Sequence, residues 1–77
     1  MSNMATGVVK FYRPDKGWGA ISSSELPAGR DAWVHVSVIE GAGHRELVDG
    51  EEVEFDYEAA KQDSFDFRAT RVRQLLS

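Results

Sequence analysis

Three ring-bearing side chains in two short runs are the residues best suited to chemistry in this 77-residue chain. Trp18 lies in the run 16–21, and Trp33 and His35 lie in the run 32–36. Successive side chains of a strand point to opposite faces, so Trp33 and His35 share one face. The opposite face is already filled by apolar residues, so we expect the three rings to point outward together. Such rings stack on unpaired bases, which indicates a binder of single-stranded nucleic acid.

Composition argues against several other kinds of site. The chain has no cysteine for a disulfide or a thiolate metal ligand, and its two histidines lack acidic residues at metal-ligand spacing. The serines at 22–24 lack a strained nucleophile motif. We therefore expect no enzymatic activity, no metal, no cofactor and no small-molecule substrate. Without a membrane-spanning stretch or a signal peptide, we expect a cytoplasmic protein with no membrane partner.

The net charge of −4 argues against a polyanionic partner, but the acidic residues are concentrated in one place. Six of them fall within ten residues: Asp49, Glu51, Glu52, Glu54, Asp56 and Glu58. They alternate with apolar residues, so we expect them on the solvated face of one strand. The rest of the chain is net positive, and the local field matters more than the net charge for a ligand that docks elsewhere. We expect binding with a shallow salt dependence.

The order of β-forming residues and turn signals predicts five strands. They are expected at 5–13, 17–24, 30–37, 51–58 and 65–75. A turn with Pro14 and Gly17 joins the first two strands as a hairpin. One helical turn is expected at 38–40 and a polar loop at 59–64. Broken alternation predicts a bulge in the first strand and another near Val72.

Five strands in so short a chain would leave exposed edges unless the sheet closed on itself. We therefore predict an all-β fold, a small five-stranded antiparallel Greek-key barrel of the OB type. The length predicts a single domain over 1–77, with its core at about 5–75 and residues 1–4 disordered. We expect the protein to be a monomer.

The run 16–21, Lys-Gly-Trp-Gly-Ala-Ile, resembles the first ribonucleoprotein motif of bacterial cold-shock proteins, Lys-Gly-Phe-Gly-Phe-Ile. The run 32–36, Ala-Trp-Val-His-Val, resembles the second, Val-Phe-Val-His-Phe. Further matches at 7–12, 47–55 and 69–72 extend the similarity over nearly the whole chain. The resemblance implies a five-stranded antiparallel barrel that binds single-stranded RNA or DNA with little sequence preference. Its members act as RNA chaperones and as regulators of transcription and translation.

The chain departs from the family pattern in its rings. Ala20 replaces the second aromatic residue of the first motif, Val36 replaces the phenylalanine after the histidine, and His44 replaces a loop phenylalanine. Phe67 stands near the family's proline and either adds a ring to the site or belongs to the core. With fewer rings, we expect weaker binding and a shorter footprint than a typical member shows. The predicted binding residues are Lys10, Phe11, Lys16, Trp18, Trp33, His35, His44 and Phe67.

Some residues have two interpretations. Lys10, Lys16 and Arg45 are candidate phosphate contacts or simply solvated charges. The arginines at 68, 71 and 73 either contact phosphate or pair with the acidic strand. Tyr12 belongs either to the core or to the site. The alternative function is a protein-interaction module on the same barrel, with weakened nucleic-acid binding.

Overall fold

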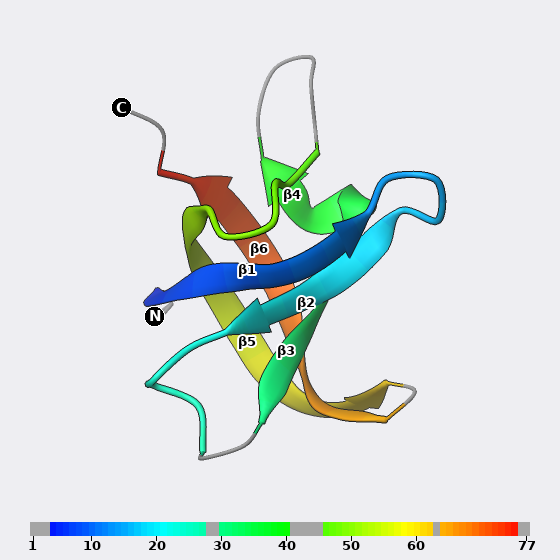
Figure 1. Cartoon of the computed structure of the whole chain (residues 1–77). Helices are drawn as coiled ribbons and strands as arrows, with labels where there is room; N and C mark the ends of the chain where they lie inside the picture. The colour runs from blue at the N-terminus through cyan, green and yellow to red at the C-terminus, as the bar shows by residue number, and fades with distance from the viewer. Residues whose placement is uncertain (1–3, 28–29, 41–45, 63, 76–77) are drawn as a thin grey trace.

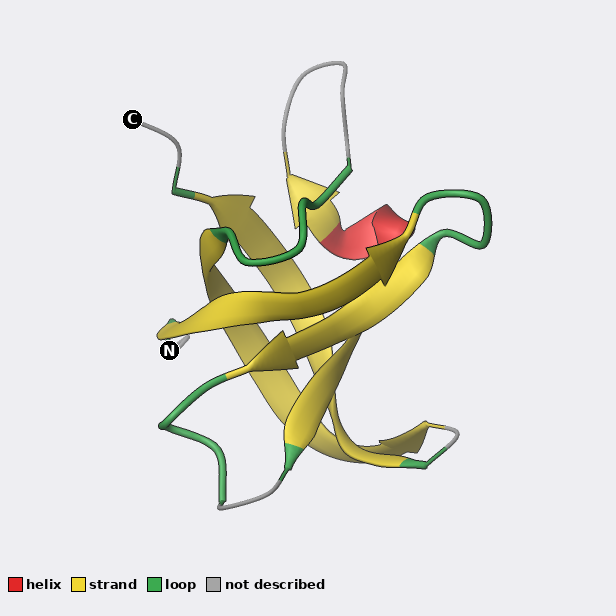
Figure 2. Ribbon diagram, in the orientation of Figure 1, coloured by secondary structure: helices red, strands yellow, loops and turns green. Residues whose placement is uncertain are grey.

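The computed structural model describes residues 4–27, 30–40, 46–62 and 64–75. Its strands are β1 (Ala5–Arg13), β2 (Trp18–Ser22), β3 (Asp31–His35), β4 (Ile39–Glu40), β5 (Glu52–Gln62) and β6 (Phe65–Gln74). One turn of 3-10 helix, η1 (Val36–Val38), separates β3 from β4 (Figure 2). In these ranges no helix has the length and apolar character that crossing a membrane requires.

The strands form one sheet in the order β3-β2-β1-β5-β6-β4, and pairing between β3 and β6 closes it into a barrel (Figure 1). The long neighbours in this order run antiparallel. The closing seam is parallel and short, with Ala32 opposite Phe67 and Trp33 opposite Arg68. The two-residue β4 also lies parallel to β6. The predicted all-β barrel of five long strands is confirmed, and β4 is a small addition to it.

Four predicted boundaries were wrong by two residues or more. β3 ends at His35 and not at Ser37, because η1 begins at Val36. β5 continues through Gln62, where a loop at 59–64 was expected, because Ala59 pairs with Phe67 and Gln62 with Phe65. A polar composition does not prevent pairing where one face of the hairpin is exposed. The helical turn lies at η1, two residues before the predicted 38–40. β2 ends at Ser22, and the Ser23 hydroxyl instead donates a hydrogen bond of 2.7 Å to the Thr6 carbonyl.

Both predicted bulges are present. The register of β1 on β2 shifts between Val9 and Phe11. The register of β5 on β6 shifts between Asp56 and Tyr57, opposite the stretch that leads to Val72. A bulge bends its strand and increases the local twist. These irregularities therefore help β1 and β6 to curve round the barrel.

Two glycines fix the geometry of the β1–β2 hairpin. A Cβ atom on Gly19 would lie 2.3 Å from the Phe11 carbonyl oxygen, so a larger residue would force the two strands apart. Gly17 has a φ of +77°, which side-chain-bearing residues rarely adopt, and its N–H donates to the Arg13 carbonyl. The hairpin is therefore tight, and it brings Phe11 beside Trp18.

The barrel interior is filled by aliphatic residues and a few rings. The fully buried large side chains are Phe55, Ile21, Ile39, Val9, Val34, Val53 and Val72. Neither tryptophan belongs to this core cluster, and both are half-buried. The rings of β2 and β3 thus lie on the outer face of the sheet.

Candidate nucleic-acid interface

β1, β2 and β3 place the predicted rings on neighbouring positions of one outer face. Trp18 is paired with His35 across β2 and β3, and Ala20 is paired with Trp33. On the other side, Phe11 is paired with Ala20. Inward positions on the same strands are occupied by buried aliphatic residues, so the alternation of each strand separates the rings from the core.

The first group of rings, which we call the edge-on cluster, consists of Phe11, Trp18 and Phe65. The Phe11 and Trp18 ring centroids lie 5.5 Å apart at an interplanar angle of 79°. Trp18 and Phe65 lie 6.4 Å apart at 78°. Edge-to-face pairs of this kind attract each other and hold the rings in place. Phe65 was not among the predicted site residues, and it reaches the cluster from the start of β6.

The second group, the stacked pair, consists of Trp33 and His35. Their ring centroids lie 5.7 Å apart and their planes differ by only 23°. Two nearly parallel rings along one strand form a flat surface of the kind on which successive bases stack.

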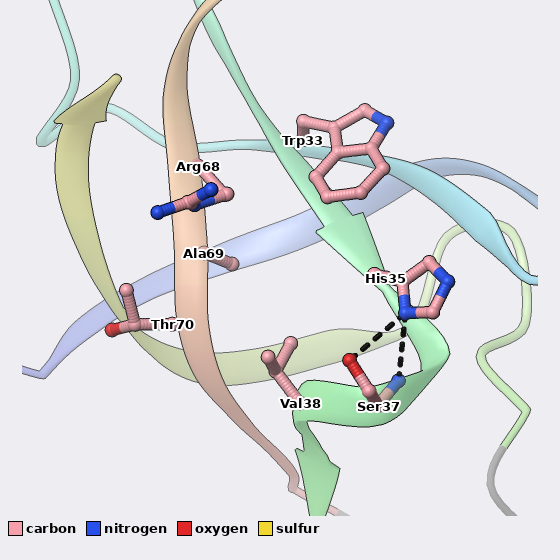
Figure 3. A pocket seen from close by; sticks show the side chains of 7 residues that line it. All are labelled: Trp33, His35, Ser37, Val38, Arg68, Ala69 and Thr70. Carbon is pink, nitrogen blue, oxygen red and sulfur yellow. Dashed lines mark hydrogen bonds between the residues drawn. The ribbon is translucent and has the colours of Figure 1, made fainter. Parts of the chain in front are cut away.

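A hydrogen bond orients the ring of His35. The Ser37 backbone N–H donates to His35 Nδ1 over 3.2 Å, and the Ser37 hydroxyl lies 2.9 Å from the same nitrogen (Figure 3). Because Nδ1 accepts from that N–H, the neutral ring carries its proton on Nε2. The free edge of His35 is therefore a donor, suited to a carbonyl oxygen on a base.

A hollow of about 440 Å³ lies beside the stacked pair. Figure 3 shows Trp33 and His35 from β3 on one side and Arg68 and Thr70 from β6 on the other. The Arg68 guanidinium is bonded to the carboxylate of Glu58. The hollow therefore combines ring surfaces and hydroxyls with a cation that is already neutralised.

Most of the basic residues described by the structure have acidic partners. Lys10 Nζ lies 3.0 Å from Asp31 Oδ2. The three arginines of β6 pair with acids as well: Arg68 with Glu58, Arg71 with Glu40 and Arg73 with Glu54. Of their two interpretations, pairing with acidic residues is the one observed, although Arg71 pairs with β4 and not with β5.

Two described cations, Arg13 and Lys16, make no ion pair with a described carboxylate. Both belong to the β1–β2 hairpin, which carries two of the three rings of the edge-on cluster. The Arg13 guanidinium carbon lies 5.3 Å from the centroid of the Phe11 ring, in cation–π contact. Arg13 was not predicted as a site residue, although its place beside the turn could have suggested it.

The sequence was compared with known proteins. Residues 5–74 match the model of the 'Cold-shock' DNA-binding domain. The chain belongs to the cold-shock domain family. It is 45% identical over 53 residues to the cold shock-like protein CspLB of Listeria monocytogenes, covering 69% of this chain and 76% of the relative. It is 41% identical over 59 residues to the cold shock-like protein CspB of Escherichia coli, covering 77% and 80%.

Membership in this nucleic-acid-binding family agrees with the barrel and with the rings on its outer face. The structure does not bring all of the predicted binding residues to this outer face, however. In this cold-shock domain Phe67 packs against the core, with its ring 5.8 Å from that of Tyr57. This partial burial against the core favours the core interpretation of Phe67, and Phe65 is the phenylalanine of β6 that contacts a site ring. His44 and Arg45 lie outside the described residues.

Two further residues of this cold-shock domain lie inward. Val36 lies in η1, is partly buried and packs against the core. Tyr12 is buried, and burial raises the pKa of its phenol above the usual 10.0, with a smaller contribution from the Glu46 carboxylate. Among the described residues, no group of three acidic or histidine side chains is arranged to hold a metal ion.

Proposed function

We propose that this protein binds single-stranded RNA or DNA by stacking unpaired bases on its outer rings. The observation that carries the proposal is the arrangement of the edge-on cluster and the stacked pair on one face of β1, β2 and β3. A base–aromatic stack contributes roughly 1–3 kcal/mol whatever the base, because every base has a π-face. The expected ligand is thus a strand recognised with little regard to sequence.

A protein that binds only unpaired strands shifts the equilibrium of an RNA hairpin toward its open form, because it stabilises that form by mass action. This supports a role as an RNA chaperone in the cytoplasm, or as a regulator of transcription or translation through transcript structure. Opening a hairpin by binding its unpaired strands requires neither catalysis nor a cofactor.

Intrinsic fluorescence tests the proposal, since both tryptophans lie in the proposed site. A pyrimidine-rich single-stranded oligonucleotide, added at low salt, should quench most of the emission. In Trp18→Ala and Trp33→Ala, the remaining tryptophan should report a weakened interaction. A double-stranded oligonucleotide of the same sequence is the control and should quench little.

The competing function is a protein-interaction module on the same barrel. It is favoured by the net charge of −4 and by the carboxylate partners of most described cations. Absence of quenching by single strands at low salt would reject nucleic-acid binding in favour of this alternative.

A further inference from the structure

Ala20 is fully buried but is not part of the packed cluster inside the barrel. It lies two residues from Trp18 on β2 and therefore points to the same outer face. Its methyl group must be covered by side chains that lie on the outside of the sheet.

A second hollow, of about 430 Å³, crosses β2 on that outer side. It is lined by Lys10 and Phe11 from β1 and by Asp31 from β3, and β2 lies between these strands in the sheet. The exposed ion pair between Lys10 and Asp31 bridges β2 on the solvent side. Phe65 lines the same hollow, so the start of β6 reaches over the outer face of β2.

Two ion pairs hold Phe65 in this position. The next residue, Asp66, is bonded through one carboxylate oxygen to Arg30, which directly precedes β3. Its other oxygen lies 3.3 Å from the Lys61 ammonium on β5. The ring of Phe65 meets Trp18 edge-on and remains partly exposed. It is thus a fixed ring with a face open to solvent.

The chemistry of this hollow suits a base better than a phosphate. Phe11 and Phe65 give it aromatic walls. Its two cations, Lys10 and Arg30, are each paired with a carboxylate that also lines it. A phosphate would have to displace those carboxylates. A flat, uncharged base can instead lie against a ring face without breaking either ion pair.

We propose that Phe11 and Phe65 form a slot on the outer side of β2 that takes one unpaired base of the bound strand. This inference rests on the proposed function, and it assigns to Phe65 a binding role that extends the ring surface from β2 onto β6. The slot is continuous with the edge-on cluster, because both of its rings contact Trp18.

Phe65→Leu tests the slot, because leucine keeps an apolar side chain at this position but removes the ring. The affinity for a labelled pyrimidine-rich single strand is measured by fluorescence anisotropy. We expect binding to weaken roughly 5- to 150-fold, the effect of losing one stack. The factor should be the same at low and moderate salt, since the hollow contributes no net charge.

Phe67→Leu is the matched control, since Phe67 lies on the same strand but packs on the core. It should lower the melting temperature and leave the affinity, measured well below that temperature, within twofold of wild type. The affinity of the double variant Phe11→Leu/Phe65→Leu should fall by a smaller factor than the product of the factors measured for the two single variants. The two rings act on the same base, so their effects are not independent.

The outcomes separate the slot from the function on which it rests. If Phe65→Leu binds within twofold of wild type while Trp33→Ala binds weakly, the slot is rejected and the proposed function stands. The slot would also be rejected if the affinity of the double variant fell by the full product of the two single-variant factors. If Trp18→Ala and Trp33→Ala both bind as wild type does, the proposed function itself is rejected.

Discussion

The edge-on cluster and the stacked pair lie on the same outer face but offer a strand two different surfaces. In the edge-on cluster, Trp18 meets Phe11 and Phe65 nearly at right angles, which leaves spaces between ring faces. In the stacked pair, Trp33 and His35 are nearly parallel and form a flat surface with a donor at one edge. The first geometry suits insertion of a base and the second suits a base laid on top.

Charge separates the two regions as well. Arg13 and Lys16 lie on the hairpin of the edge-on cluster without carboxylate partners among the described residues. Arg68, beside the stacked pair, is paired with Glu58. We infer that phosphates are attracted mainly at the edge-on cluster, while the stacked pair works through ring contact and hydrogen bonding. Among the described residues, the cations without a carboxylate partner thus lie beside the edge-on cluster and not beside the stacked pair.

The largest expected effect comes from removing the central ring of the edge-on cluster. Trp18→Ala should weaken single-strand binding more than Trp33→Ala, by at least about threefold, because it also removes the edge contacts that hold Phe11 and Phe65. Trp33→Ala alone should cost roughly 5- to 150-fold. Anisotropy titrations at one salt concentration measure both. Equal losses would show that the two regions contribute alike.

A smaller effect is expected from the two unpaired cations. Each phosphate contact contributes about 0.7 to the slope of log K against log salt for a single strand. Lys16→Gln and Arg13→Gln should each lower the magnitude of the slope by that amount and weaken binding several-fold at low salt. Lys10→Gln is the matched control, since Lys10 is already paired with Asp31. A slope change in Lys10→Gln as large as in Lys16→Gln would contradict the proposed division of charge.

The smallest effect concerns the scaffold that both regions share. The pKa of Tyr12 is raised in the folded state, so the protonated phenol stabilises the fold at pH values below about 10. This contribution is lost as the pH rises through the folded-state pKa. Above pH 10 the melting temperature of wild type should therefore fall more steeply than that of Tyr12→Phe. Parallel melting curves for the two proteins across this range would contradict the assignment.

The barrel could be predicted from the sequence because its signals are local. Alternation located the long strands, Gly17 and Pro14 marked the first turn, and broken alternation located both bulges. The end of β5 was missed for a physical reason. The stretch 59–62 has no apolar alternation, and it is a strand only because β6 pairs with it.

The site was predictable where it depended on one strand and was not where it depended on contacts between strands. Trp18, Trp33 and His35 follow from alternation. Phe65 and Phe67 lie two residues apart on β6, and their sequence does not indicate which one meets Trp18. Likewise, the pairing of Lys10 with Asp31 requires β1 and β3 to lie on either side of β2. Such distinctions depend on the closed barrel.

One strand also determines the order in which this barrel can form. β6 pairs with β3, β4 and β5, so three strands have an unpaired edge until it arrives. It is the last of the strands in chain order. Its pairing with β3 closes a long loop of chain, and the entropy lost in closing such a loop slows folding. During synthesis the first three strands can form only an open meander. The finished barrel, with both tryptophans in place beside Phe65, therefore has to form after β6 has left the ribosome.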